Sequence, residues 1–249
     1  MSGRSVRVVE SYAGLAERVL AAPARLGRTR LVAVDGPSGA GKTVFAARLA
    51  VALAALPGGP PPVVHTDDLL DGWTDQFTFW PRLEEAVLTP LRGGQPGGYH
   101  RYSWVRRCFT PRRVPVPPAP VVLLEGVGVA RSAIRAELSL AVFVTAPTRL
   151  RVARALARDG AEVAAALVRW RRNERAHFAT EATRRHADLV VDGAPEVPHD
   201  PERCYVRIAG PAGRSDGSPG QIDGFSGRSD GSSGRSCGSR RSVRPPTAR

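Results

Sequence analysis

The chain has 249 residues, of which 36 are Lys or Arg and 23 are Asp or Glu, so its formal net charge is +13. A hydrophobic content of 42% excludes a wholly disordered chain, and no apolar run reaches the roughly 18 residues needed to span a bilayer. The first residues lack the apolar stretch of a signal peptide, and Cys108, Cys204 and Cys237 are too few and too scattered for a disulfide framework. These features predict a cytoplasmic protein.

The positive charge comes almost entirely from arginine, because Lys42 is the only lysine of the sequence. An excess of cations suits a nucleic acid or a polyphosphate substrate equally well. Charge alone therefore leaves both classes of partner open.

Residues 1–208 alternate helix-like and strand-like stretches and are predicted to form one domain. Ser11 can cap a helix that runs through Val19, and Pro81 suits the first turn of a helix that continues through Leu91. Five strands alternating with helices predict an α/β fold, a five-stranded parallel sheet flanked by helices. The Pro- and Gly-rich stretch 93–120 is expected to be irregular and long enough to be functional. The strands are predicted at residues 29–34, 63–65, 121–124, 140–145 and 188–191, and two further helices at residues 44–56 and roughly 148–179.

Residues 209–249 differ in character from the rest of the chain. From Gly213 they repeat with a period of seven and contain almost no apolar residues. Such a segment cannot offset its ordering entropy, so a disordered Gly/Ser/Arg-rich tail is predicted. An appendage without function is favoured over an arginine-assisted contact with RNA or acidic partners.

An eight-residue motif, GPSGAGKT, lies between the predicted strand 29–34 and the helix 44–56. It fits the P-loop pattern G-x-x-x-x-G-K-[ST], whose glycines let successive N–H groups point at phosphate oxygens while the helix N-terminus adds partial positive charge. Lys42 would then bridge the β- and γ-phosphates and Thr43 would bind Mg²⁺, which predicts ATP and Mg²⁺ as ligands. The nucleotide-binding residues are predicted to be Gly36, Pro37, Ser38, Gly39, Ala40, Gly41, Lys42 and Thr43.

Three carboxylates follow predicted strands, where an open parallel sheet binds its ligands. Glu125, directly after the strand 121–124, is placed to hold Mg²⁺ directly or through water; a solvated loop residue is the alternative. Asp67 and Asp68 follow the strand 63–65, and either could take the proton of an acceptor hydroxyl. An Asp here can also cap a helix, and the two roles are compatible because one Asp can cap while the other acts.

Arginines are dense in the helical region predicted over residues 148–179. Arg154 and Arg158 are four residues apart, hence on one helix face, from which guanidinium groups can stabilise charge on a transferring phosphoryl group. The alternative for each is a solvated helix face in an arginine-rich protein.

These markers, in this order, resemble the uridine kinase family of P-loop kinases, which is related to phosphoribulokinase and bacterial pantothenate kinase. The resemblance runs from about residue 31 to residue 193 and is carried by GPSGAGKT, TDD at 66–68, PLRGG at 90–94, YHRYSW at 99–104, VLLEG at 122–126, RDG at 158–160 and ADLVV at 187–191. It implies a P-loop, nucleotide kinase-like fold. It also implies Asp67 as the catalytic base, Tyr102 beside the nucleobase, and Arg154 and Arg158 as the lid arginines.

The acceptor side departs from the family pattern. Leu70 stands where uridine kinases have a Tyr that contacts the nucleoside, and Ser103 replaces the Asp of Tyr-Asp-Trp. No Phe-Asp-His-Pro element is present, so Asp75 is the nearest candidate for gripping the ribose hydroxyls. The predicted acceptor pocket combines carboxylates with aromatic faces suited to a flat base, and the alternative is that the aromatics anchor a Pro-rich loop onto the core. Its residues are Asp68, Asp75, Tyr99, Tyr102 and Trp104, with Trp73 nearby.

The sequence thus predicts a kinase that transfers the γ-phosphoryl group of ATP to a hydroxyl of a small molecule, first of all a nucleoside 5′-hydroxyl. A kinase of a sugar, pantothenate or coenzyme precursor remains an alternative, as does a P-loop ATPase without a small-molecule acceptor. A GTPase switch is disfavoured because the Asn-Lys-x-Asp base reader is missing from the sequence. ATP and a small alcohol are the expected partners, no membrane or nucleic acid is expected, and the oligomeric state is open.

Overall fold

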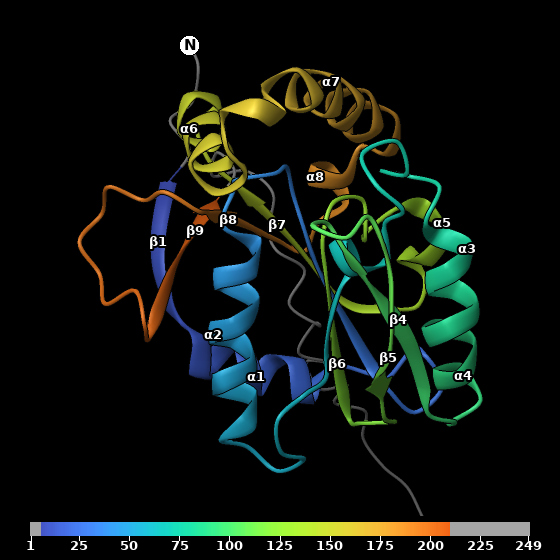
Figure 1. The fold of residues 1–249 in the computed structure, drawn as a ribbon. Helices are drawn as coiled ribbons and strands as arrows, with labels where there is room; N and C mark the ends of the chain where they lie inside the picture. Colours follow the sequence, from blue (N-terminus) through green and yellow to red (C-terminus); the bar gives the residue numbers. More distant parts are fainter. Residues whose placement is uncertain (1–5, 210–249) are drawn as a thin grey trace, which may run out of the picture. The chain divides into compact units, whose positions relative to one another are not determined.

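The structure is a computed structural model that describes residues 6–209. Within these residues the central sheet has seven strands in the order β1-β9-β8-β7-β2-β6-β3 (Figure 1). The five strands from β8 to β3 pair in parallel, which confirms the predicted parallel sheet. Two strands that the pattern did not predict, β1 and β9, extend the sheet antiparallel beyond β8. The bounds are β1 Val6–Ser11, β2 Arg30–Asp35, β3 Val63–His65, β6 Val121–Glu125, β7 Leu138–Thr145, β8 Leu189–Asp192 and β9 Cys204–Ala209.

The inner strands are apolar on both sides, because each side of the sheet is covered. In β2, Leu31 and Ala33 belong to one buried cluster, whereas Val32 and Val34 belong to the other. This alternation follows from the period of two along a strand. Two apolar faces explain why β2, β6 and β7 read as continuous hydrophobic runs.

Helices α1 (Tyr12–Ala21) and α2 (Lys42–Ala54) cover one face, in the cluster that contains Val32 and Val34 (Figure 1). The predicted cap of α1 is confirmed, since the Ser11 hydroxyl accepts a hydrogen bond from the N–H of Gly14 at 3.1 Å. Helix α2 begins with the last two residues of the P-loop motif, so the phosphate-binding loop leads directly into its N-terminus.

The opposite face is covered by short helices and by a separate hairpin. Pro81 lies in the first turn of α3, as predicted, and α3, η2 and α4 follow one another without a break. Their buried leucines pack on Leu31, Ala33 and the facing residues of β6. The elements on this face are η1 Thr66–Leu69, α3 Trp80–Leu83, η2 Glu84–Leu88, α4 Thr89–Arg92 and α5 Ser132–Arg135.

The expectation that residues 93–120 are irregular is wrong. They contain β4 (Gly97–Ser103) and β5 (Cys108–Val116), which pair antiparallel as a two-stranded sheet of their own. Aromatic and β-branched residues face each other across the pair, as Tyr102 does Phe109 and Tyr99 does Val114. Such cross-strand pairs stabilise a hairpin, and its outer edges tolerate the prolines that suggested an irregular loop.

The long helical region predicted over residues 148–179 is divided at Gly160, whose φ of 88° ends the first helix. Helix α6 (Thr148–Asp159) is followed by the 3-10 turn η3 (Ala161–Val163) and by α7 (Ala164–Glu181). Figure 1 shows α6 and α7 together at the top of the view. A last short helix, α8 (Thr183–His186), leads into β8.

Strand β9 ends at Ala209, the first residue of the predicted tail, and residues 210–249 lie outside the described part of the chain. The domain boundary and the disordered tail therefore stay predictions. Among residues 6–209, no helix combines the length and the apolar character required to cross a membrane.

Candidate functional site

The P-loop connects β2 to α2 through two glycines that no other residue could replace without a clash. Gly36 has a φ of 141°, and a Cβ there would collide with the carbonyl of Val144 in β7. Gly39 has a φ of 75°, and a Cβ there would collide with the backbone of Arg151 in α6. Both positive φ values are ones that side chains rarely adopt. The motif therefore curls tightly between the sheet and α6.

Asp35, the last residue of β2, fixes the start of this loop. Its buried carboxylate accepts hydrogen bonds from the N–H groups of Gly36 at 2.6 Å, Gly128 at 2.8 Å and Ala130 at 2.9 Å. Burial raises the pKa of Asp35 to about 6, although these three bonds favour the ionised form. One carboxylate thus joins the P-loop to the loop that follows β6.

A cavity of about 700 Å³ opens over the P-loop. It brings together residues that lie far apart in the sequence, and it contains the predicted phosphate, metal, base and lid positions. Lys42 is buried in it, with Nζ 3.4 Å from the carbonyl oxygen of Pro37. The predicted residues on its wall are Ser38, Gly39, Gly41, Lys42, Thr43, Asp67, Glu125, Arg154 and Arg158.

Thr43 and Glu125 meet at the bottom of this cavity. The Thr43 hydroxyl donates to Oε1 of Glu125 at 3.3 Å, and Nδ1 of His65, at the end of β3, lies 2.8 Å from Oε2. Burial alone would raise the pKa of Glu125, but His65 and Lys42 outweigh it and lower the pKa, while the hydrogen bond raises that of His65. A hydroxyl and an ionised carboxylate are hard oxygen donors that fit Mg²⁺. No cluster of three or more His, Cys, Asp or Glu among the described residues could hold a metal by itself, so the fit requires phosphate and water ligands as well.

The structure separates the two aspartates after β3. Asp67 faces the cavity, where the surrounding protein raises the pKa of its carboxyl group above the ordinary value, although Lys42 and Arg158 oppose this. Asp68 instead accepts hydrogen bonds from Nε of Arg101 at 3.0 Å and from the hydroxyl of Tyr99 at 3.4 Å. Asp68 is thus tied to the hairpin, and Asp67 is the one directed at the phosphate site.

Arg154 and Arg158 reach the cavity from α6. Arg154 donates to the carbonyl oxygens of Gly39 at 3.2 Å and Gly193 at 3.1 Å. Arg158 forms two hydrogen bonds with Asp159, and Asp67 and Glu125 also contribute to raising its pKa. Both arginines therefore line the cavity, and Arg154 contacts the P-loop directly.

The structure does not bring the predicted acceptor residues to the phosphate cavity. Tyr99 and Tyr102 are buried under the hairpin, and Trp104 packs against Tyr102 at 5.3 Å and against Trp73 at 5.2 Å between ring centroids. Tyr99 lines a separate cavity of about 520 Å³, which shares no residue with the first. Burial raises the pKa of Tyr99 to about 12. The part of these aromatics in an acceptor site stays a prediction.

Asp75 is engaged by its own segment. Its carboxylate accepts from the N–H of Asp71 at 2.8 Å and from the hydroxyl of Thr78, and it pairs with Arg82. These bonds hold the turn that precedes α3. None of these contacts supports the predicted binding of ribose hydroxyls by Asp75.

Sequence reasoning missed Glu174, which contacts the P-loop from α7. Its Oε1 lies 2.8 Å from the N–H of Ser38, 136 positions earlier in the chain. The signal for it is weak: Leu167, Trp170 and Glu174 are spaced as one buried helix face, and a Glu at such a position needs a partner. His65, at the end of β3, was also missed, because its contact with Glu125 joins residues 60 positions apart.

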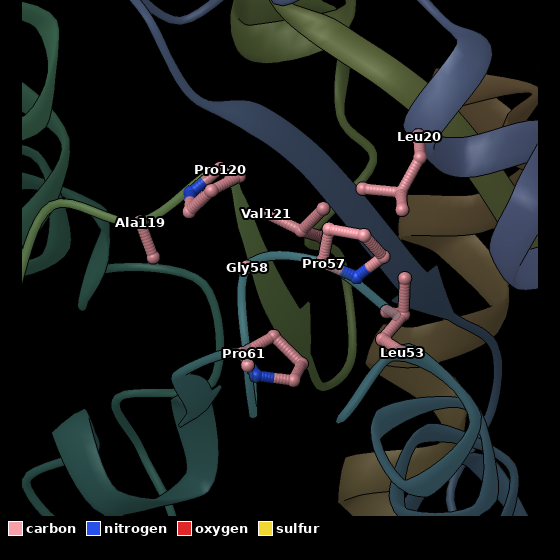
Figure 2. Close-up of a pocket in the computed structure, with 9 residues that line it drawn as sticks. Leu20, Leu53, Pro57, Gly58, Pro61, Ala119, Pro120 and Val121 are labelled. Atoms are coloured by element: carbon pink, nitrogen blue, oxygen red, sulfur yellow. The ribbon is translucent and has the colours of Figure 1, made fainter. Parts of the chain in front are cut away.

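A small hollow at the start of β6 is not part of this site (Figure 2). Its volume of about 10 Å³ holds at most one water molecule. The side chains on its walls are apolar and come from Leu20, Leu53, Pro57, Pro61 and Val121 among others, so its polar groups are those of the backbone.

Comparison with known proteins agrees with this geometry. No family model matches the chain. Uridine kinases from two strains of Klebsiella pneumoniae are each 30% identical to it over 111 residues, which is 42% of this chain and 52% of theirs. The chain therefore spans about half the length of the curated relatives it matches.

A solved structure from Bacillus stearothermophilus, named a possible uridine kinase, covers 72% of this chain and 96% of its own with a TM-score of 0.55. At 19% identity it shows the fold alone. The predicted α/β fold with a parallel sheet flanked by helices is confirmed, as is the resemblance to uridine kinases.

Proposed function

We propose that the protein is an ATP-dependent kinase that transfers the γ-phosphoryl group to a hydroxyl of a small molecule, with a nucleoside 5′-hydroxyl as the first candidate. The observation that carries the proposal is a single cavity in which Lys42, Thr43 and Glu125 of a phosphate site meet a carboxylate, Asp67, that can act as a base. The similarity to uridine kinases supports a kinase with a nucleotide-binding P-loop.

The donor would bind with its phosphates over the P-loop. The backbone N–H groups, the N-terminus of α2 and Lys42 supply positive charge to the β- and γ-phosphates. Thr43 and Glu125 would hold Mg²⁺, which neutralises charge on the phosphate oxygens when it is bound. Arg158, next to Asp67 and Glu125, is placed to stabilise charge on the transferring group.

Asp67 would act on the acceptor. Its carboxylate takes the proton of the hydroxyl as the hydroxyl oxygen forms a bond to the γ-phosphorus, and the bond from that phosphorus to the β–γ bridging oxygen breaks to release ADP. Asp68 is the weaker candidate for this role, because Arg101 and Tyr99 already occupy its carboxylate.

The choice of a nucleoside as the acceptor is supported by the named relatives and not by residues on the cavity wall. A different small alcohol has a specific observation in its favour. Of the aromatics expected to stack on a base, Tyr99 and Tyr102 of β4 are buried, and Asp75 is paired with Arg82. This second candidate keeps every residue of the phosphate chemistry and changes only the acceptor.

ADP release with MgATP and a panel of acceptors tests the proposal. Uridine and cytidine, a set of sugars, pantothenate and a mixture without acceptor form the panel, and Asp67→Asn serves as the matched inactive variant. Release that depends on a nucleoside and is lost in the variant supports the proposal. Release with another alcohol alone removes the nucleoside, and equal release without any acceptor replaces the kinase with an ATPase.

A further inference from the structure

Three hydrogen-bond donors converge on one oxygen of Glu174 behind the P-loop. Oε1 accepts from the N–H of Ser38 at 2.8 Å, from the Ser38 hydroxyl, and from Nε1 of Trp170 at 3.0 Å. The same indole N–H also lies 2.9 Å from the Ser38 hydroxyl oxygen, so the three residues form a closed triangle. Glu174 is only 2% exposed. Such a concentration of donors suits an ionised carboxylate.

A buried negative charge next to a loop that binds phosphates would repel the phosphates. A carboxylate at this position therefore needs a structural role. The wall of the phosphate cavity includes Ser38 but not Glu174, so the carboxylate lies behind the loop. Arg151 of α6, 4.0 Å from Oε2, offsets part of its charge. Glu174 accepts the N–H of Ser38 and so turns it away from the cavity, immediately before the tight turn at Gly39.

The other side of the triangle contacts the segment that follows Asp67. The ring of Trp170 packs edge-on against Trp73 at 5.6 Å between centroids, and Trp73 contacts Trp104 of the hairpin at 5.2 Å. The backbone oxygen of Trp170 accepts from the side-chain amide of Gln76 at 3.2 Å. Trp170 and Glu174 of α7 therefore contact both the P-loop and the segment that follows Asp67.

We propose that Glu174 is a positioning residue which, together with Trp170, holds the P-loop in its phosphate-binding conformation and ties it to the segment after Asp67. This inference rests on the proposed binding of ATP at the P-loop. Glu174 does not touch the donor or the acceptor and acts through Ser38. Its loss would leave the N–H of Ser38 and the indole N–H without their acceptor, and the turn at Gly39 would lose its support.

Binding of MgATP to full-length variants tests the inference. Glu174→Ala should weaken the affinity at least tenfold, whereas Glu174→Gln, which keeps an amide oxygen in the same place, should recover most of it. A carboxylate that only repels phosphate predicts the reverse, since its removal would tighten binding. Glu181→Gln is the matched control, because Glu181 lies on the same helix but binds Ser132 and Arg135 away from the loop; it should leave the affinity unchanged.

Two further readouts separate positioning from general support of the fold. All measurements are made well below the lowest melting temperature of the set. Trp170→Phe keeps an aromatic ring next to Trp73 but removes the N–H that Glu174 and Ser38 accept, so it should weaken MgATP binding. In steady-state assays, Glu174→Ala should raise the KM for ATP more than the KM for the acceptor.

Failure of the inference and failure of the proposed function look different. If the wild-type protein does not bind MgATP, both are overturned. If the wild type binds MgATP and Lys42→Ala weakens that binding, while Glu174→Ala matches the wild type in affinity, the inference alone is wrong. Should the alanine variant not fold, a wild-type affinity of Trp170→Phe has the same meaning.

Discussion

Replacement of Asp67 by Asn tests the proposed chemistry most directly. Among the described residues, the carboxylates that line the cavity over the P-loop are Asp67, Glu125 and Asp192. The last two already accept hydrogen bonds from other side chains. Glu125 is bonded to His65 and Thr43, and Asp192 is bonded to Arg7 at 2.8 Å. No second free carboxylate can replace the base, so we expect a loss of kcat near the upper end of the usual range, about 10³- to 10⁴-fold.

The assay is a pH profile of kcat/KM for the acceptor, measured beside the affinity for MgATP. A base must be ionised to work, and partial desolvation on the cavity wall, with the nearby Glu125 and Asp68, raises the pKa of the Asp67 carboxyl group above its ordinary value, although the side chain remains exposed. Activity should therefore fall with unit slope as the pH drops through this raised pKa, and the slope should be absent from the residual activity of Asp67→Asn. The variant removes a negative charge beside the phosphates, so its affinity for MgATP should be equal to or greater than that of the wild type.

Asp68→Asn is the control, since it removes a neighbouring carboxylate that is already paired with Arg101. We expect this variant to keep kcat within a few-fold of the wild type. If Asp67→Asn keeps near-full activity while Asp68→Asn loses it, the base is the second aspartate. If neither substitution matters, the proposed proton transfer is refuted.

Three other substitutions or deletions probe separate parts of the molecule. Lys42→Ala should weaken MgATP binding as well as turnover, because its charge serves the phosphates in both the bound and the transition state; calorimetry that shows unchanged affinity would contradict this. Tyr102→Ala should raise the KM for the acceptor well above its effect on the KM for ATP, and equal effects would indicate that the ring only packs against Trp104 and Phe109. Deletion of residues 210–249 should leave the melting temperature and the kinase activity unchanged, since β9 ends at Ala209 and the cavity lies within the preceding residues; a large drop in melting temperature would oppose it.

The inner sheet could be predicted because its strands are buried on both faces and therefore stand out as apolar runs. Strand β1 could not, since Arg7 and Glu10 interrupt its valines without a regular alternation and all six of its residues are exposed or half-buried. Hairpin strands β4 and β5 were concealed by their prolines and glycines. Edge positions tolerate those residues, so composition alone gives the wrong expectation there.

The residues of the candidate site also differ in whether a local sequence pattern could predict them. The P-loop is contiguous in the sequence, and Asp67 and Glu125 each follow a strand, so general rules for parallel sheets place all of them at one edge. Glu174 and His65 depend on how distant elements pack, and no local pattern reports that packing. Asp75 shows the opposite difficulty, because a carboxylate that looks available in the sequence is used by the turn around it.

The hairpin β4–β5 forms no ladder with the central sheet. Its two strands pair with each other, whereas Asp35 joins the P-loop to the loop after β6, and Arg154 joins it to Gly193 after β8. None of those hydrogen bonds involves a residue of the hairpin. Under the proposed function, an acceptor site carried by the hairpin can therefore vary in sequence without changing the hydrogen bonds of the P-loop.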